Sequence, residues 1–384
     1  MKKINVAFCI PDMIIGGVET VLISTLEELL KTGEFNISVF MRSPLQEPFY
    51  IEWFEKHPEI KLTSTAPLVP FFENLKKHTK FFPLENIRKI TFSIYKRYKR
   101  LTLSYGNIDI FIDYKNCQFF KELQNIKKPK ITWIHGSFEF FEEHRYINMI
   151  KKYDKLVVLT NDFMNDFIKK YPEHKNKVAN IYNPIGLDDI KSKLEKAPRY
   201  EGKYFCCVSR LSPPKDIRTI IYAFNEFYQR DNAKDIKLLI VGDGPKRKEL
   251  EDLKENLVAR DNIVFIGTAT NPYGYMRDSI AHILSSTHEG FGMVLTEAAI
   301  TKTLNISSNH KSGASEILLD GQGGYLFEIG DVIGLSKIMS IACTNDIERQ
   351  KKIDTMYDSL ERFSAKKTTE KIYSLIKETL HDHR

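Results

Sequence analysis

The chain has 384 residues, a length at which two hydrophobic cores are more usual than one. Hydrophobic residues make up 42%, charged residues 28%, and the mean hydropathy is -0.32, values typical of a water-soluble protein. The net charge of +7 is modest, and no run of about 18 apolar residues predicts a membrane-spanning helix.

The N-terminal part alternates apolar runs with helical patterns. We interpret Ile4 to Ile10 as a first strand and not as a signal peptide, because its apolar run is short and closes at Pro11. Residues 43–74 are interrupted by prolines and are expected to be irregular, apart from a short strand near 61–63. Further strands are predicted at 36–41, 108–113, 129–135 and 155–160, and a helix follows the last of them up to about residue 170.

A glycine pair, Gly16-Gly17, lies between the first strand and a helical pattern over 21–30. Such a turn exposes backbone N–H groups that suit an anion, although most glycine pairs are simple turns. No third glycine follows at the spacing of a dinucleotide-binding loop. This absence disfavours a nicotinamide-dependent oxidoreductase, as does the continuation of Gly242-Asp-Gly244 into Pro-Lys-Arg.

The segment 75–106 is unusually basic. It contains nine lysines and arginines, one acid (Glu85) and interleaved phenylalanines and tyrosines. This composition suits an anionic membrane surface or an anionic glycolipid. A helix that packs on its own domain with a solvated basic face is the alternative, and no nucleic-acid-binding motif is present.

His135 comes directly after a predicted strand, at the edge where open α/β sheets bind ligands. A histidine there can hydrogen-bond or protonate an oxyanion, or it can be a structural loop residue. The five cysteines are odd in number, form no Cys-x-x-Cys pair and lie mostly in apolar runs. We therefore expect reduced, buried thiols in a cytoplasmic protein.

The second half repeats the alternation of strand and helix after a charged stretch, 191–202, that fits a linker. Strands are predicted at 204–210, 236–241, 262–267, 280–287, 305–308 and 324–327, and helices at 217–228 and 246–257. The loop after the first of these strands carries Arg210 and Lys215 around two prolines. Two cations five residues apart can clamp a diphosphate, although loop cations are often simply solvated.

The sequence Glu289-Gly-Phe-Gly-Met-Val-Leu-Thr-Glu297 indicates a turn that leads into a helix. Gly290 and Gly292 allow close approach of the backbone, and the first N–H groups of the helix at Met293 and Val294 suit a phosphate. Glu297 lies about 7–8 Å along the helix from Gly292, at about 1.5 Å per residue. The two acids can accept hydroxyl hydrogen bonds on either side of a phosphate, or they can be ordinary solvated residues.

These patterns predict an α/β protein with two doubly wound domains. We expect an N-terminal domain over 1–187, to which a terminal helix over 363–384 crosses back, and a C-terminal domain over 188–362.

The segment Thr287-His-Glu-Gly-Phe-Gly, with Glu297-Ala298, resembles the Glu-x7-Glu pattern of retaining glycosyltransferases of family 4. The resemblance covers nearly the whole C-terminal half, and in the N-terminal half only strand ends and the Gly16-Gly17 loop. It implies the GT-B architecture, in which two Rossmann-like domains face a central cleft. Lys302 and Leu304 replace the usual turn residues after the helix, and Ser312-Gly313 stands where a glycine pair is usual.

The resemblance also implies a role for each matching residue. Arg210 and Lys215 would bind the donor diphosphate and stabilise the departing nucleotide, while Glu289 and His135 would hold the donor sugar. Glu297 would bind the ribose. The remaining expected substrate contacts are Gly16, Gly17, Asn183, Gly267, Thr268, Gly290, Phe291, Gly292, Met293 and Val294.

The implied activity is a retaining, metal-independent transfer of a hexose from a nucleotide sugar, and UDP-hexose is the favoured co-substrate. No Asp-x-Asp pair ends a strand, so we expect no metal and no other cofactor. Two alternatives remain open at this point: a UDP-sugar 2-epimerase of the same fold, and a non-catalytic nucleotide-sugar-binding protein. The expected acceptor is a lipid-linked glycan, as in lipopolysaccharide or other surface-polysaccharide synthesis, used by a cytoplasmic enzyme at the inner membrane face.

Overall fold

The structure is a computed structural model that describes residues 3–14, 16–64, 106–310 and 313–383. The basic segment 75–106 lies outside these residues, apart from Gly106. The chain divides into two compact units, each described by itself. The first unit holds Met1–Leu159, Phe167–Ile181 and Thr368–Arg384, and the second holds Thr160–Asp166 and Tyr182–Lys367.

The first unit is built on a parallel sheet of seven strands in the order β3-β2-β1-β4-β5-β6-β7. The order reverses at β1, which pairs with β2 on one side and β4 on the other. The strands are β1 (Ile4–Ile10), β2 (Phe35–Met41), β3 (Lys61–Ser64), β4 (Ile110–Asp113), β5 (Lys130–Ile134), β6 (Lys155–Val158) and β7 (Val178–Asn180). The helices are α1 (Gly17–Lys31), α2 (Pro48–Lys56), α5 (Phe120–Leu123), α6 (Phe138–Glu143), α7 (Ile147–Ile150) and α8 (Asn161–Lys170), and a 3-10 turn η1 (Pro172–His174) follows α8. The first turns of α8 belong to the second unit.

The second unit has a parallel sheet of six strands in the order β10-β9-β8-β11-β12-β13, which reverses between β8 and β11. The strands are β8 (Lys203–Val208), β9 (Ile236–Val241), β10 (Ile263–Gly267), β11 (Ala281–Leu284), β12 (Asn305–Ser308) and β13 (Tyr325–Phe327). The helices are α9 (Leu187–Glu195), α10 (Ile217–Arg230), α11 (Arg247–Lys254), α12 (Tyr273–Arg277), α13 (Met293–Ile300), α14 (Ala314–Ile317), α15 (Val332–Thr344) and α16 (Asp346–Asp358), with 3-10 turns η2 (Pro213–Lys215), η3 (Arg260–Asn262) and η4 (Ser359–Phe363).

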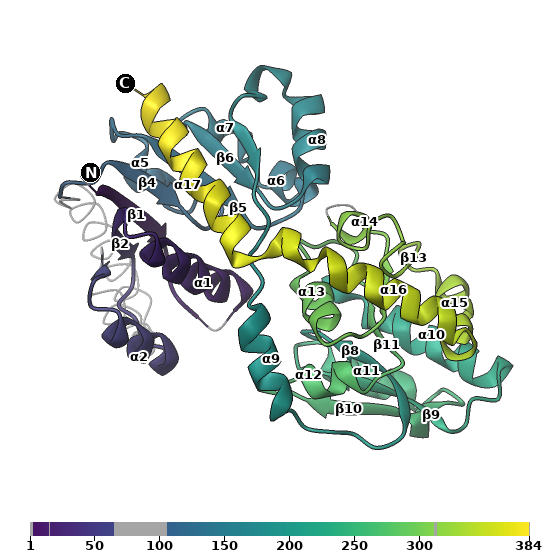
Figure 1. Ribbon diagram of the computed structural model, residues 1–384. Helices are drawn as coiled ribbons and strands as arrows, with labels where there is room; N and C mark the ends of the chain where they lie inside the picture. The colour runs from purple at the N-terminus through teal and green to yellow at the C-terminus, as the bar shows by residue number, and fades with distance from the viewer. Residues whose placement is uncertain (1–2, 15, 65–105, 311–312, 384) are drawn as a thin grey trace, which may run out of the picture. The chain divides into compact units, whose positions relative to one another are not determined.

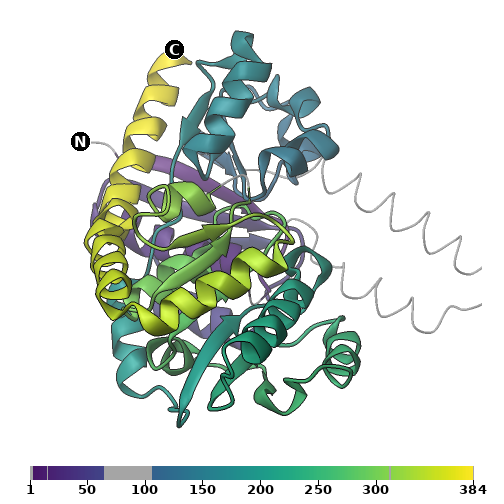
Figure 2. The ribbon, with the colours of Figure 1, turned by 90° about the vertical axis from the view of Figure 1, so that its right-hand side faces the viewer.

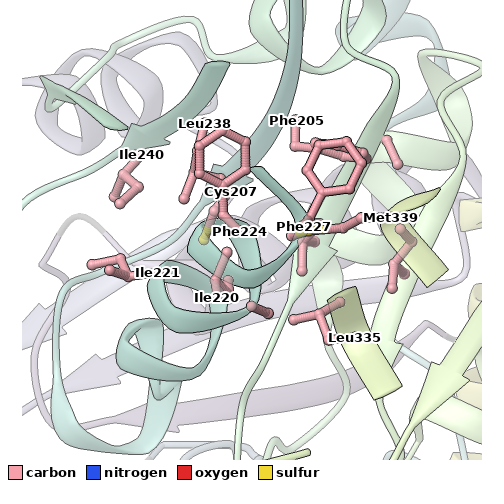
Figure 3. Close-up of a cluster of buried hydrophobic side chains, with 14 of the residues drawn as sticks. Phe205, Cys207, Ile220, Ile221, Phe224, Phe227, Leu238, Ile240, Leu335 and Met339 are labelled. Atoms are coloured by element: carbon pink, nitrogen blue, oxygen red, sulfur yellow. The ribbon is translucent and has the colours of Figure 1, made fainter. Parts of the chain in front are cut away.

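The core of the second unit lies between its sheet and helices α10 and α15 (Figure 3). Phe205 and Leu238 project from β8 and β9, and Phe224 and Phe227 of α10 meet them. Phe205 and Phe227 pack edge to face, with ring centroids 5.6 Å apart. This packing fixes the strands whose carboxyl ends carry the charged loops described below.

The C-terminal helix α17 (Ala365–Asp382) starts in the second unit and continues into the first (Figures 1 and 2). Tyr373 donates a hydrogen bond to Glu34 at 2.6 Å and packs against Phe35 of β2. Lys155 at the start of β6 pairs with Glu378 of the same helix. The last helix is therefore part of the first unit's packing.

The predicted α/β class is confirmed, and every predicted strand has a counterpart in the structure, whereas β7 was not predicted. Two expectations are wrong. Residues 43–74 are not irregular throughout, because Pro48 starts α2 and the helix buries Tyr50, Trp53 and Phe54 on one face. The stretch 191–202 is not all linker, because α9 extends to Glu195 and buries Ile190.

All five cysteines are free, and four of them are buried, as predicted. Within the described ranges, no helix is both long enough and apolar enough to cross a bilayer.

Candidate active site

Two charged loops meet at the point where the order of the second sheet reverses. The loop after β8 carries Arg210 and Lys215, and the loop after β11 carries Glu289. Because β8 and β11 are parallel neighbours, both loops leave the same edge of the sheet. This is the edge at which open α/β sheets bind ligands.

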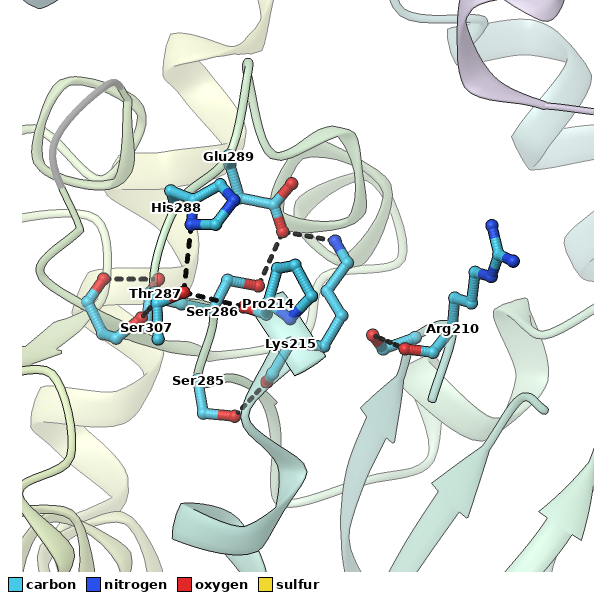
Figure 4. Close-up of polar contacts among 11 residues, drawn as sticks. Arg210, Pro214, Lys215, Ser285, Ser286, Thr287, His288, Glu289 and Ser307 are labelled. Atoms are coloured by element: carbon cyan, nitrogen blue, oxygen red, sulfur yellow. Dashed lines mark hydrogen bonds and ion pairs between the residues drawn. The ribbon is translucent and has the colours of Figure 1, made fainter. Parts of the chain in front are cut away.

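Lys215 and Glu289 form an ion pair at this edge (Figure 4). The ammonium donates to Oε1 of the carboxylate, and the Ser286 hydroxyl donates to the same oxygen at 2.6 Å. The two side chains are 25% and 14% exposed, so water screens the pair only in part. Oε2 of Glu289 makes no hydrogen bond with any described residue, which leaves it able to accept one from a ligand hydroxyl.

Hydroxyl side chains of the β11 loop hold the β8 loop in place. Ser285 donates to the carbonyl oxygens of Lys215 and Asp216 at 2.8 and 2.9 Å. The Thr287 amide donates to the carbonyl of Pro214 at 2.8 Å. We interpreted 280–287 only as the end of a strand, so these positioning residues were missed. Their run of adjacent hydroxyls was the available signal.

Arg210 is exposed, and its guanidinium makes no ion pair or hydrogen bond with the described residues. In Figure 4 it stands apart from the Lys215–Glu289 pair. Its backbone is fixed by the glycine turn after β9: a Cβ on Gly242 would lie 1.9 Å from the Ser209 carbonyl oxygen, and one on Gly244 would lie 2.4 Å from that of Leu211. Only glycines allow this close approach of the two loops.

The loop between Glu289 and α13 turns at Gly292, whose φ of 88° is in the left-handed region that favours glycine. Gly290, Met293 and Val294 are half-buried around this turn. The ring of Phe291 is buried and packs against Tyr182 and Phe363, with centroids 5.9 and 5.4 Å away. Phe291 thus anchors the loop through its ring, and only its backbone is free for a ligand.

Glu297 lies in the second turn of α13. Burial raises the pKa of this carboxyl to about 7, and Lys193 on α9 opposes the shift. Its side chain keeps partial exposure and makes no hydrogen bond with the described residues. The group therefore changes charge near neutral pH.

The other expected contacts of the second unit lie at strand ends and in a loop. Gly267 ends β10 with φ of 86°, and Thr268 after it is exposed. Asn183 is 7% exposed, and its side-chain Oδ1 is buried with no partner among the described residues.

In the first unit, His135 follows β5 and its ring Nε2 lies 2.7 Å from the carbonyl oxygen of Tyr114. A carbonyl oxygen can only accept, so Nε2 carries the proton and Nδ1 keeps a lone pair. Burial lowers the pKa of His135 to about 4, and Lys115 adds to this shift. Nδ1 is buried and has no partner among the described residues. The ring thus suits a hydroxyl donor and not an oxyanion.

Gly16 and Gly17 precede and begin α1 in the first unit. A Cβ on Gly16 would lie 2.8 Å from Oε2 of Glu19, whereas nothing lies within 4 Å of one on Gly17. Buried Glu19 accepts from Lys115 at 2.6 Å, and Asp12 accepts from the same ammonium at 3.0 Å. This charged cluster next to the glycine pair was not predicted, because Asp12 and Lys115 follow two different strands and Glu19 lies in the first turn of α1.

Within the residues that the structure describes, no three His, Cys, Asp or Glu side chains are grouped so that they could hold a metal ion. The independence from metal that we expected stays a prediction.

A doubly wound parallel sheet with charged loops at its switch point is the arrangement of an α/β nucleotide-binding protein. Residues 189–357, which carry those loops, match the family described as "Glycosyl transferases group 1". The match to the group 1 glycosyl transferases thus covers the charged loops of the second unit and less than half of the chain.

The sequence identity to individual relatives is low, at 26% for the two relatives described here. One relative is an N-acetylgalactosamine-N,N'-diacetylbacillosaminyl-diphospho-undecaprenol 4-alpha-N-acetylgalactosaminyltransferase of Campylobacter jejuni. The two sequences are 26% identical over 202 residues, and this stretch covers 52% of this chain and 54% of that protein. Another relative is a lipopolysaccharide 1,6-galactosyltransferase of Escherichia coli. The two sequences are 26% identical over 269 residues, and this stretch covers 66% of this chain and 71% of that protein. The chain thus spans about half the length of the first of these relatives.

Among solved structures, Anabaena HepE in complex with UDP is similar with a TM-score of 0.72 and 16% identity, covering 98% of this chain and 100% of that chain. This likeness shows the fold alone, and the GT-B fold class that we predicted is confirmed.

Proposed function

We propose that the chain is a retaining glycosyltransferase that moves a hexose from a UDP-sugar to a lipid-linked or surface-polysaccharide acceptor. One observation carries this proposal: Lys215 and Glu289 form an ion pair at the point where the strand order of the second sheet reverses. Lys215 comes from the loop after β8, which also holds Arg210. A cation and an acid placed side by side suit a ligand that has a diphosphate next to a sugar.

The chemical difficulty of such a transfer is the negative charge that grows on the leaving diphosphate. Prearranged cations and backbone N–H groups stabilise that charge without reorganisation. Arg210, Lys215 and the start of α13 after Gly292 are the groups that we assign to this task. The bond between the sugar carbon and the phosphate oxygen breaks, the acceptor oxygen bonds to the same face of that carbon, and the acceptor proton passes to the departing phosphate oxygen.

The sugar and the ribose need hydrogen-bond acceptors for their hydroxyls. We assign Oε2 of Glu289 and Nδ1 of His135 to the donor sugar, because each lacks a partner among the described residues. Glu297 is assigned to the ribose. As an uncharged ring, His135 accepts from a hydroxyl and takes no part in proton donation.

The relatives support the choice of substrates. HepE is similar in fold and was solved with UDP. The names of the Campylobacter and Escherichia proteins describe transfer to an undecaprenol-linked sugar and to lipopolysaccharide. We propose UDP-linked galactose, glucose or an N-acetylhexosamine as donor, and action at the cytoplasmic face of the membrane.

The test is incubation of the protein with each UDP-sugar, with and without a lipid-linked oligosaccharide and with a chelator present. The proposal predicts UDP release that depends on the acceptor and survives chelation, with a product whose NMR couplings show the donor's anomeric configuration. An isomerised UDP-sugar formed without acceptor identifies a 2-epimerase instead. An inverted product overturns retention, and no turnover with any donor overturns the transferase proposal.

A further inference from the structure

The loop that follows β4 holds His135 at two points. The carbonyl oxygen of Tyr114 accepts from the ring Nε2, and the side-chain Oδ1 of Asn116 accepts from the His135 backbone amide, both at 2.7 Å. Because β4 and β5 are parallel neighbours, this loop lies beside His135 at the carboxyl end of β5. The two contacts fix both the backbone and the ring of His135.

The bond from the Asn116 side chain replaces a backbone bond of the sheet. The backbone amide of Asn116 donates to the carbonyl oxygen of Trp133 at 2.8 Å. In a parallel pair of strands, a residue that donates in this way also accepts, through its own carbonyl, from the amide two residues further along. That amide belongs to His135, and it donates to the side-chain oxygen of Asn116. Asn116 therefore extends the pairing beyond the end of β4 and up to His135.

The backbone conformation of Asn116 explains why a side chain takes this place. Its φ is 52° and that of Cys117 is 54°, so two successive residues lie in the left-handed region. Asparagine adopts this region more readily than most residues other than glycine. Glycine would fit the turn but would offer no oxygen, and aspartate would offer an oxygen together with a charge. Asparagine meets both requirements without adding a charge.

We propose that Asn116 is a positioning residue for His135, which fixes the end of β5 so that the ring Nδ1 points at the donor sugar. This inference rests on the proposed function, because it takes a sugar hydroxyl to be the partner of Nδ1. Nδ1 is buried and has no partner among the described residues, and the direction of its lone pair is set by the backbone and by the Tyr114 carbonyl. Loss of the Asn116 oxygen lets the ring move, which weakens the bond to the sugar and leaves the binding of UDP itself unchanged.

The test compares Asn116→Gly, Asn116→Ala and Asn116→Asp in the full-length protein. Asn116→Gly keeps the left-handed turn and removes only the oxygen, whereas Asn116→Asp keeps an acceptor oxygen. The matched controls are Asn232→Gly and Asn232→Ala, because Asn232 has a φ of 50°, is exposed and makes no side-chain hydrogen bond with the described residues. Thermal unfolding checks that each variant is folded, and Asn116→Gly serves as the test if Asn116→Ala does not fold.

The donor for these measurements is the one that the unaltered protein uses among UDP-galactose, UDP-glucose and UDP-N-acetylglucosamine. Asn116→Gly and Asn116→Ala should lower kcat/KM for this donor about tenfold, the scale of one lost hydrogen bond, with unchanged affinity for UDP by titration calorimetry. Asn116→Asp should recover most of the loss, and the Asn232 variants should change neither quantity. Full activity in Asn116→Gly, an equal loss for UDP and the donor, or an Asn116→Asp variant no better than Asn116→Gly overturns the role of Asn116.

A second measurement needs no turnover. Nitrogen NMR of labelled histidine rings, with His135 assigned from His135→Gln, should show a proton on Nε2 and none on Nδ1 in the unaltered protein. In Asn116→Gly the His135 signals should move toward those of a ring that exchanges between tautomers, and in Asn116→Asp a fixed proton on Nε2 should remain. Unchanged signals in Asn116→Gly overturn the positioning role. If no donor is turned over, the proposed function fails, and the ring signals still test the positioning by themselves.

Discussion

Lys215 has one ammonium group and two proposed partners. It donates to Glu289 in the structure, and we propose that it also serves the donor diphosphate. An ammonium group can donate three hydrogen bonds, so both partners can be met at once. The pair would then couple the binding of the diphosphate to the orientation of the carboxylate that holds the sugar.

Replacement of Lys215 by methionine removes the charge and keeps most of the side-chain volume. We expect kcat to fall by about 10²–10³-fold, the usual cost of losing one prearranged charge-stabilising group, with a much smaller change in donor affinity. Arg210→Gln should behave in the same way. Steady-state kinetics with varied donor separates the two effects.

The control for that experiment is Lys203→Met, since Lys203 pairs with Asp235 at 3.4 Å and both side chains are exposed. It should leave kcat and donor affinity unchanged. Equal losses in kcat and in donor affinity for Lys215→Met would contradict the role assigned to its charge.

Glu297 gives the candidate site a pH dependence. Because its pKa is raised to about 7, it is mostly protonated at pH 6 and mostly ionised at pH 8. Ribose hydroxyls donate more strongly to a carboxylate than to an acid. UDP affinity should therefore rise several-fold between these pH values, and Glu297→Gln should flatten the profile. A profile that keeps its shape in the variant would assign the titration to another group.

The raised pKa of Glu297 also makes the stability of the folded chain depend on pH. Stability falls as pH rises, whereas the expected UDP affinity increases. The pKa of Glu297 is higher in the folded chain than its ordinary value of 4.5, so its favourable contribution is complete below 4.5 and is lost as pH rises through 7. Glu297→Gln should raise the unfolding temperature relative to the unaltered protein at pH 8 and not at pH 4. A matching gain at both pH values would argue against buried charge as the cause.

At the scale of elements, three loops at the ends of β8, β9 and β11 hold one another. The glycine turn after β9 packs on the backbone of the β8 loop at Ser209 and Leu211. Further along the β8 loop, the Ser285 hydroxyl after β11 donates to the carbonyl oxygens of Lys215 and Asp216. The position of Arg210 thus depends on contacts with the loops after β9 and β11.

Gly244→Ala tests this dependence. The new Cβ would meet the Leu211 carbonyl oxygen at 2.4 Å, so the β8 loop must shift. We expect a loss of about 1–3 kcal/mol of stability, as for other overpacked sites, together with reduced kcat. Gly186→Ala is the control, because its nearest contact would be an ordinary 3.6 Å. Full activity in Gly244→Ala, measured below its unfolding temperature, would show that Arg210 does not need this support.

Sequence patterns predict elements better than they predict neighbours. The strands were predictable because buried parallel strands are continuous apolar runs, and α2 could have been found from Pro48 and the spacing of Tyr50, Trp53 and Phe54. The contact of Lys215 with Glu289, 74 residues apart, was not predictable from the residues alone. It depends on β8 and β11 being adjacent, and local periodicity does not specify strand order.

At the scale of the whole molecule, the distribution of charge suggests where the protein works. We propose that the basic segment 75–106 attaches the protein to anionic membrane surfaces. Sedimentation with vesicles that contain anionic lipid should pull the protein down at low salt and release it at high salt. Replacement of Lys76, Lys77, Lys80 and Lys89 by glutamine should weaken this binding.

Replacement of four lysines elsewhere, Lys234, Lys248, Lys351 and Lys371, is the matched control, since it removes the same net charge. Equal losses in both variants would mean that only net charge matters. Binding that ignores salt and lipid charge would contradict the membrane proposal altogether.

The most direct test of the central claim is a crystal structure of the protein with bound UDP. We predict that the diphosphate oxygens lie about 3 Å from the Arg210 guanidinium, the Lys215 ammonium and the first amides of α13, with the ribose at Glu297. A diphosphate bound away from the loops after β8 and β11, or one that contacts neither cation, would contradict it.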